Sequence, residues 1–393
     1  MYDFDEIIDR HGTGCAKYDA IPGEVHRKDV IPLWIADMDF RTPDFVIDAL
    51  KRRLEHPILG YPVVPEDYFT TIAEWVSTLH GWSVDPLHIR YIPGIVKGIG
   101  LALNTLLKPG DKVVIQPPVY HPFRIVPEKN GFEVLCNPLI PVYEDGTLVD
   151  YRMDFEGLDK LMDEGAKAII IANPHNPAGI CWSRETLEKL AEITSAKGVL
   201  VISDEIHAEM ALFGHRHIPY ASVSEAAASN SITFMAPSKT FNIAGVVTSY
   251  AIIESESLRE RFFRFLDANE LDSPSIFAIE ATLAAYRNGS AWRKEMLAYV
   301  EGNINFVITY LETRIPRIKA LRPQASFLVW LDCRGLGLSH DALQELFTEK
   351  AGDFPNDGSM FGEQGQGFMR LNVGCPRAVL ERALDRLEAA LKS

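Results

Sequence analysis

The chain has 393 residues, of which 47% are hydrophobic and 24% are charged, and its formal net charge is -15. This composition is typical of a folded globular protein, and the length allows two domains of ordinary size. The acidic excess argues against a nucleic-acid or anionic-membrane surface, because phosphate groups are bound by clustered lysine and arginine. No run approaches the roughly 18 apolar residues of a membrane span, and the first residues are acidic where a leader peptide would be basic. We therefore expect a cytoplasmic protein.

The five cysteines are scattered along the chain at Cys15, Cys136, Cys181, Cys333 and Cys375. Their number is odd and no two of them form a C-x-x-C pair. We expect reduced thiols, without a disulfide framework and without a zinc site.

Short apolar runs in the middle of the chain predict strands that are buried on both faces of a mostly parallel sheet. These runs lie at 113–115, 168–172, 199–202 and 232–234. A helix with Ser183 as N-cap and a stop at Gly198 connects the second run to the third. Because ligands of open α/β sheets bind at the carboxyl ends of the strands, we expect the functional residues directly after these runs.

The pattern changes after Pro274 to a long helical stretch, which we expect to lead into a smaller domain. The elements predicted there are a strand at 326–331, a helix at 342–350, a glycine-rich loop at 361–367, a strand at 368–373 and a final helix from Pro376. The predicted architecture is α/β, with a large domain at 48–285 and a small α+β domain at 286–393. The N-terminal segment, residues 1–47, is expected to pack on the small domain.

Four polar segments follow predicted strands, at 93–98, 173–179, 203–207 and 238–245. Their order and spacing resemble those of the fold-type-I pyridoxal-phosphate (PLP) enzymes of the aspartate aminotransferase superfamily, over essentially the whole chain. Within that superfamily, IADMDF at 35–40, SDEIH at 203–207, SKTFNIAG at 238–245 and RLN at 370–372 resemble the MalY/PatB-type cystathionine β-lyase family.

This resemblance implies that Lys239 forms an imine with the aldehyde of PLP and later removes the substrate Cα proton. It implies that Asp204, 35 residues earlier (239 − 204 = 35), pairs with the protonated pyridine nitrogen. The ordinary alternatives are a solvated lysine and a helix N-cap aspartate. The resemblance also places His207 and Asn176 near the phenolic oxygen of the cofactor and stacks Tyr120 on its ring. A structural histidine, a turn asparagine and a rim tyrosine are the alternatives.

The resemblance implies that Asn173 also contacts the cofactor. It further implies a binding site for the cofactor's phosphate group. The phosphate is expected at a helix start after Gly94, where backbone N–H groups are available. The residues implied in binding it are Ile95, Val96, Lys97 and the hydroxyl of Ser238. Many aminotransferases carry a phosphate-binding arginine where this chain has Val247. The segment around Tyr61 resembles one whose tyrosine reaches the phosphate of the neighbouring subunit, which implies a homodimer.

Arg370 begins a predicted strand, and its guanidinium can hold a carboxylate at two points. The resemblance assigns it to the α-carboxylate of an amino-acid substrate, together with Asn176 and Asp37. A surface salt bridge is the alternative.

Two patterns imitate other kinds of site. The first is a group of residues whose spacing fits no standard set of metal ligands: His207, Glu209, His215 and His217. The glycine-rich loop from Gly362 resembles a dinucleotide-binding loop but lacks a preceding strand and a later acidic residue. We expect neither a metal nor a dinucleotide.

The residues named above serve more than one reaction. We favour elimination of a thiol from cystathionine or another cysteine S-conjugate, which yields pyruvate and ammonia. Transamination is the second hypothesis. A protein that uses a PLP-enzyme fold mainly for regulation or interaction is a third hypothesis, from a different class.

Overall fold

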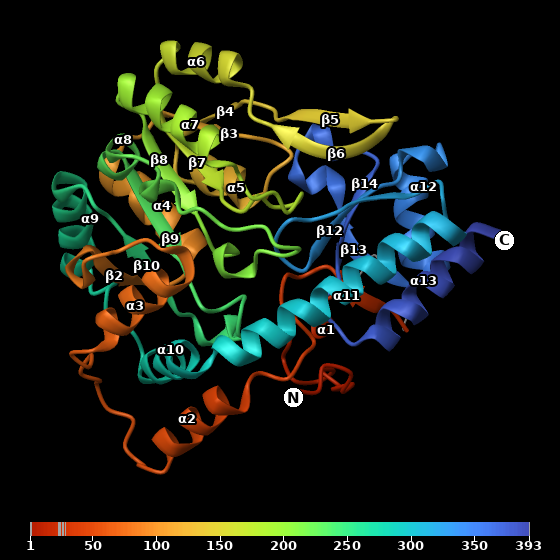
Figure 1. Ribbon diagram of the computed structural model, residues 1–393, viewed down its shortest axis with the longest axis horizontal. Coiled ribbons are helices and arrows are strands. Elements are labelled where there is room, and N and C mark those ends of the chain that lie inside the picture. Colours follow the sequence, from red (N-terminus) through yellow and green to blue (C-terminus); the bar gives the residue numbers. More distant parts are fainter. Residues whose placement is uncertain (1, 23–24, 26, 28, 393) are drawn as a thin grey trace.

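The computed structural model describes residues 2–22, 25, 27 and 29–392. Its largest sheet has seven strands (Figure 1), in the order β2 (Ile89–Ile92), β10 (Ser249–Ile252), β9 (Ser231–Met235), β8 (Leu200–Asp204), β7 (Ala166–Ala172), β3 (Lys112–Ile115) and β4 (Glu133–Cys136). Every neighbouring pair is parallel except those of β10, which runs antiparallel to both β2 and β9. The mostly parallel sheet and its four predicted strands are confirmed.

Both faces of this sheet are buried because its central strands carry apolar side chains in both directions. Ile170 and Ile202 pack on one face with helices α4 (Ile95–Leu106), α5 (Pro122–Lys129) and α9 (Glu256–Ala268). Ile169 and Val201 pack on the other face with α6 (Phe155–Asp163), α7 (Arg184–Ala196) and α8 (Glu225–Ser229). The Ser183 side chain accepts a hydrogen bond from the backbone N–H of Thr186, so the predicted N-cap of α7 is confirmed.

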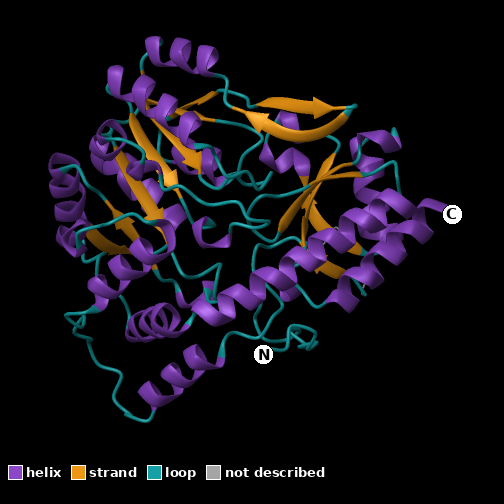
Figure 2. Ribbon diagram, viewed as in Figure 1, coloured by secondary structure: helices purple, strands orange, loops and turns teal. Residues whose placement is uncertain are grey.

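A second sheet lies apart from the first (Figure 2) and has five strands, in the order β1 (Ile31–Leu33), β13 (Asp353–Asp357), β14 (Phe368–Asn372), β12 (Leu328–Asp332) and β11 (Lys319–Leu321). Helices α11 (Ser290–Arg314) and α13 (Arg377–Lys392) pack beside it. The helix predicted at 342–350 is observed as α12 (His340–Glu345) followed by a π-helical turn (Leu346–Ala351). The N-terminal segment enters this sheet, since β1 pairs in parallel with β13.

The remaining elements surround these two sheets. They are α1 (Ala16–Asp19), α2 (Asp44–Leu54), α3 (Tyr68–His80), the hairpin β5 (Ile140–Glu144) and β6 (Thr147–Arg152), and α10 (Ile276–Asn288). Within the described part of the chain, no helix has both the length and the apolar character needed to cross a membrane.

The buried side chain of Asn303 on α11 joins this helix to the segment between β14 and α13. Its amide nitrogen donates to the carbonyl oxygens of Val373, at 2.9 Å, and Cys375, at 2.8 Å. Its amide oxygen accepts a hydrogen bond of 2.8 Å from Nε of Arg377. One side chain therefore satisfies three polar groups where the chain leaves the second sheet.

We expect Asn303→Ala to lower the free energy of unfolding by about 2 kcal/mol, because two buried carbonyl groups lose their donor. The midpoint of urea unfolding measures this loss. Asn305→Ala is the matched control, because Asn305 lies on the same helix, is exposed and bonds only the side chain of Arg322. Its effect is expected within about 0.5 kcal/mol. Equal losses in both variants would contradict this role of Asn303.

Candidate active site

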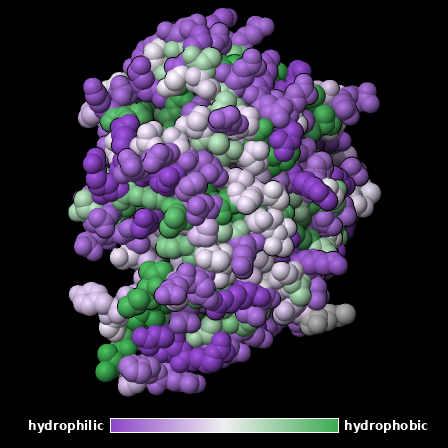
Figure 3. All heavy atoms as spheres, turned by 60° about the vertical axis from the view of Figure 1, so that its left-hand side comes forward, coloured by the Kyte–Doolittle hydropathy of each residue, from purple (hydrophilic) through white to green (hydrophobic). Residues whose placement is uncertain are grey.

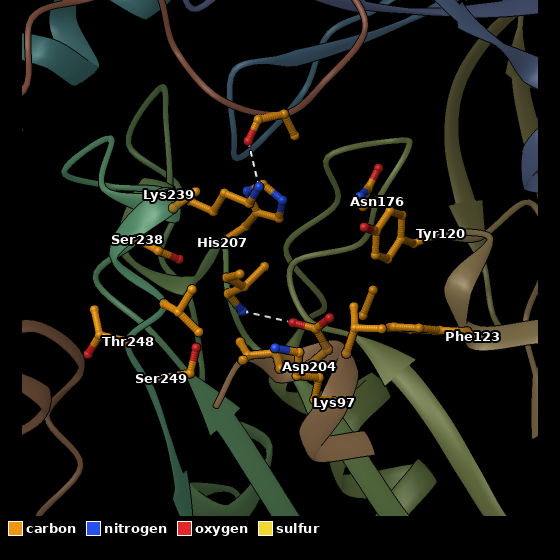
Figure 4. A pocket seen from close by; sticks show the side chains of 18 of the residues that line it. Lys97, Tyr120, Phe123, Asn176, Asp204, His207, Ser238, Lys239, Thr248 and Ser249 are labelled. Carbon is orange, nitrogen blue, oxygen red and sulfur yellow. Dashed lines mark hydrogen bonds between the residues drawn. The ribbon is translucent and has the colours of Figure 1, made fainter. Parts of the chain in front are cut away.

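A cavity of about 310 Å³ lies at the carboxyl ends of the parallel strands of the seven-stranded sheet (Figure 4). The segments that follow β2, β3, β7, β8 and β9 all contribute to its wall, as the strand rule predicts. The lining residues include Gly94, Ile95, Val96, Lys97, Tyr120, Asn176, Asp204, His207, Ser238 and Lys239. Residues far apart in the sequence thus meet in one enclosed space.

Lys239 follows β9, and its side chain extends into the cavity (Figure 4). Its Nζ donates a hydrogen bond of 2.5 Å to the carbonyl oxygen of Ala36. Burial lowers the pKa of Lys239 from 10.5 to about 8, while Asp37 and Asp204 act in the opposite direction and Arg370 adds to the lowering. The amine is therefore far easier to deprotonate than an exposed lysine.

Asp204 is the last residue of β8 and is buried. Its carboxylate accepts a hydrogen bond of 3.1 Å from the backbone N–H of Ile206. Burial raises the pKa of Asp204 to about 7. Among the described residues, no cationic side chain lies within ion-pair distance of this carboxylate. A buried carboxylate with this environment suits a ligand that presents a protonated nitrogen to it.

Tyr120 and Asn176 face Lys239 and Ser238 across the cavity (Figure 4). Burial raises the pKa of Tyr120, so its hydroxyl keeps its proton at neutral pH. Burial lowers the pKa of His207 to about 3, so the imidazole is neutral. Nδ1 of His207 is buried and has no hydrogen-bond partner in the protein. The polar groups that surround the cavity are thus available to a ligand.

Arg370 on β14 is buried and contacts this cavity through Asn176, whose Oδ1 accepts a bond of 2.9 Å from Nη1 of Arg370. Nη2 donates to the carbonyl oxygen of Trp34, at 3.0 Å, and to Oδ1 of Asn356. The ring of Phe361 lies 4.9 Å from the guanidinium carbon. Nε is buried without a partner, so a donor remains for a carboxylate.

The cavity ends at the start of α4, which begins at Ile95, directly after Gly94. The helix begins here because Gly94, with φ at 111°, turns the chain directly into the first helical turn. The backbone N–H groups of this turn are without helical partners and lie on the cavity wall. Ser238 lies on the same wall, and so do two hydroxyl residues that the sequence did not indicate, Thr248 and Ser249.

Val247 also lines the cavity, in a left-handed backbone conformation with φ at 57°. No arginine stands at this point. Of the residues that line the cavity, Lys97 and Lys239 are the cationic ones.

Four of the residues expected in the site do not line this cavity: Arg370, which contacts it through Asn176, and the three that follow. Asn173 is buried behind the wall, where its amide nitrogen donates to the carbonyl oxygen of Ile218 at 2.9 Å. Asp37 lines a second cavity that adjoins the first. Tyr61 is fully exposed in the segment that follows α2.

The histidine-rich segment after Asp204 separates in the structure. His217 is buried, and its Nε2 lies 2.6 Å from Oε2 of Glu205. Glu209 instead accepts hydrogen bonds from Trp75 and Tyr286. Within the described residues, no three His, Cys, Asp or Glu side chains are grouped as metal ligands. The glycine-rich loop from Gly362 follows β13 and forms short 3-10 turns (Gly358–Phe361 and Glu363–Gly365).

Comparison with known proteins agrees with this geometry. Residues 28–387 match the family Aminotransferase class I and II. The chain is 43% identical to cystathionine beta-lyase PatB of Bacillus subtilis, over 99% of each chain. It is 33% identical to protein MalY of Escherichia coli, over 100% of each.

Solved structures give the same result. A PLP-bound putative aminotransferase from Clostridium difficile has a TM-score of 0.95 and 38% identity, with 100% of both chains covered. Cystalysin from Treponema denticola, which contains PLP, has a TM-score of 0.94 and 34% identity, covering 100% of this chain and 99% of that one.

The cavity fits this cofactor. A lysine amine of lowered pKa suits an aldehyde, and a buried carboxylate without a cation suits a protonated pyridine nitrogen. The first turn of α4 and the serine hydroxyl offer the donors that a phosphate needs. The chain belongs to the class I and II aminotransferase family of PLP-dependent enzymes and, within it, to the group that includes the cystathionine β-lyase PatB and MalY.

Proposed function

We propose that this enzyme is a PLP-dependent carbon-sulfur β-lyase that cleaves cystathionine or other cysteine S-conjugates to pyruvate, ammonia and a thiol. The observation that carries the proposal is the presence of the Lys239 amine and the Asp204 carboxylate in one cavity of a chain related to a cystathionine β-lyase. Aminotransferases share that pair of residues, and transamination is the second candidate because a putative aminotransferase is among the similar structures.

When bound, PLP supplies an aldehyde that joins to amines and a ring that accepts the electron pair released at the substrate Cα. Lys239 holds the cofactor and then takes the Cα proton on Nζ, for which its lowered pKa is suited. The Asp204 carboxylate would accept a hydrogen bond from the protonated pyridine nitrogen, and Tyr120 would pack against the ring. His207 and Asn176 offer polar contacts to its phenolic oxygen.

Arg370 binds the substrate carboxylate through its free Nε and keeps its charge at neutral pH, although burial lowers its pKa to about 10. Asn176 fixes the guanidinium from the cavity side, and Asn356 fixes it from behind. Ile95, Val96, Lys97 and Ser238 hold the phosphate.

The sheets support a division into domains. The strands of the seven-stranded sheet lie within 48–285, and four strands of the five-stranded sheet lie within 286–393. The fifth, β1, belongs to the N-terminal segment 1–47. We assign the cofactor to the large domain and the substrate carboxylate to the small domain.

The five free cysteines support a cytoplasmic location.

The active enzyme is a homodimer in this proposal. The segment after α2 exposes apolar side chains, which appear as the green group at the lower left of Figure 3. They are Ile58, Leu59 and Val63, and the fully exposed ring of Tyr61 lies in the same segment. Such a group on a projecting segment favours burial against a second copy, and Tyr61 then reaches the phosphate of the partner subunit.

The reaction is tested by incubating the purified protein with cystathionine. We expect a thiol, pyruvate and ammonia in equal amounts, with turnover that continues without a 2-oxo acid. Conversion of the cofactor to its pyridoxamine form, with turnover only after a 2-oxo acid is added, would instead establish the aminotransferase. A protein that binds PLP and performs neither reaction would favour the regulatory role.

Lys239→Ala tests the cofactor linkage. We expect loss of the visible absorption of the lysine-bound cofactor and a loss of lyase activity of at least about a hundredfold, the usual contribution of a general base. Lys97→Ala is the matched control, because Lys97 lines the same cavity, and it should keep the absorption. A borohydride-reducible linkage that persists in Lys239→Ala would show that another lysine holds the cofactor.

The dimer is tested by placing charge on the exposed apolar segment, with Ile58→Asp and Leu59→Asp combined. Gel filtration should show a monomer, because a carboxylate must lose its water to enter an interface. The cofactor should bind about tenfold more weakly, the loss expected for one hydrogen bond to a charged group. Leu87→Asp, at another exposed leucine, should remain dimeric. A dimer that survives the double substitution would exclude this interface.

A further inference from the structure

A second cavity, of about 690 Å³, adjoins the first and shares Ala36, Lys239 and Ala244 with it. One wall of the second cavity is formed by residues 35–40, which we call the strap. The strap passes directly over the reactive lysine, since the carbonyl oxygen of Ala36 accepts the hydrogen bond of Lys239 Nζ. Figure 4 shows this contact at the upper end of the first cavity.

The backbone of the strap is fixed by two asparagine side chains from other parts of the chain. Asn372 donates to the carbonyl oxygens of Ile35, at 2.6 Å, and Asp37, at 2.7 Å. Asn242 donates to those of Met38 and Phe40, both at 2.8 Å. Arg10 and Lys17 also donate to the strap backbone, to the carbonyl oxygens of Met38 at 3.2 Å and Asp37 at 3.3 Å, but the four asparagine bonds hold the strap without them.

Two side chains of the strap, Asp37 and Asp39, carry negative charges. Two cations from the residues before β1 form ion pairs with them. Arg10 grips the Asp37 carboxylate at two points, with Nη1 at 3.1 Å from Oδ1 and Nη2 at 2.7 Å from Oδ2. Arg10 also lies 2.5 Å from Oδ1 of Asp39. Lys17, which is fully buried, lies 2.9 Å from Oδ2 of Asp39. The cluster is thus neutral in sum.

The charged groups that face Lys239 come from several elements. Asp37 of the strap and Asp204 of β8 favour its cationic form, whereas Arg370 of β14 favours its neutral form. His207 is neutral, and Tyr120 and Lys97 complete the titratable groups that line the first cavity. Of the two carboxylates that act on Lys239, Asp37 is the one paired with an arginine.

We propose that Arg10 is a positioning residue for the reactive lysine: it holds and neutralises the Asp37 carboxylate, so that the nitrogen of Lys239 is not locked in its cationic form. The inference rests on the proposed role of Lys239 as the cofactor-bearing base. It gives Arg10 a part in the reaction, although Arg10 itself does not line the first cavity.

The test is the pH titration of the visible absorption of the purified holoenzyme, in which the titrating atom is the cofactor-linked nitrogen of Lys239. Arg10→Gln removes the two-point partner of Asp37 and leaves only Lys17 Nζ, at 3.7 Å from Oδ1 of Asp37, as its described cation, so the midpoint should rise by about 1 pH unit. Asp37→Asn removes the carboxylate and leaves Arg10, so the midpoint should fall. The double variant should titrate near the wild-type midpoint, and Arg10→Lys should lie between wild type and Arg10→Gln. The acid limb of the pH profile of kcat should move in the same directions.

Arg41→Gln is the control, because Arg41 also lines the second cavity but is exposed and pairs with Glu6 instead of a carboxylate of the strap. It should leave the midpoint unchanged. Equal shifts in Arg41→Gln and Arg10→Gln, or an upward shift in Asp37→Asn, would overturn the inference. Asp37→Asn keeps both Arg10 and Lys17. It therefore measures the effect of the Asp37 charge on the Lys239 nitrogen even if Arg10→Gln fails to fold. A wild-type protein without visible absorption would overturn the proposed function itself, and the inference with it.

Discussion

The structure depends on one constraint, which is that an amine and a carboxylate are buried in the same cavity without forming an ion pair. Lys239 donates to a backbone carbonyl group, and Asp204 accepts from a backbone N–H group. A direct pair would lower the cost of burying both groups. Keeping them apart requires rigid supports: Asp204 ends the fully buried strand β8, and Lys239 lies in the turn that follows the fully buried strand β9. The unpaired groups are then compensated by a ligand that carries the complementary chemistry at each end.

A second principle of the site is that asparagine side chains bind the backbone around it. An amide nitrogen has two hydrogens and can satisfy two carbonyl oxygens at once. Asn372 and Asn242 do this for the strap, and Asn303 does it beyond β14. Each of them joins segments far apart in sequence. Irregular backbone near the cavity is thereby fixed as firmly as a strand.

The sequence predicted those parts of the fold that depend on local pattern. The buried strands, the Ser183 cap and the positions of Asp204 and Lys239 after their strands follow from apolar runs and short motifs. The site residues that it missed depend on tertiary contacts. Ser249 reaches the cavity wall because β10 runs antiparallel, and Asn356 meets Arg370 because β13 pairs with β14.

The turn after β7 also contains a position that could not be predicted from the sequence, because tertiary contacts determine it. Asn173 and Asn176 belong to one motif and were expected in one site. The path of the turn places Asn176 on the wall and Asn173 behind it, held by the Ile218 carbonyl group. Side-chain direction in an irregular turn is set by what the turn packs against, and no spacing rule encodes that information.

The acid–base character of the cavity is therefore a property of the whole fold and not of one motif. Its charges come from the strap, β8, β14 and the segment before β1, whose described residues form one short helix, α1. That segment is anchored because β1 pairs with β13, so Ile31 lies beside Asp353 in the five-stranded sheet. The pairing carries the chain into the strap, where Asp37 meets Arg10. The strand pairing that completes the second sheet therefore also fixes where the strap and its charges lie relative to Lys239.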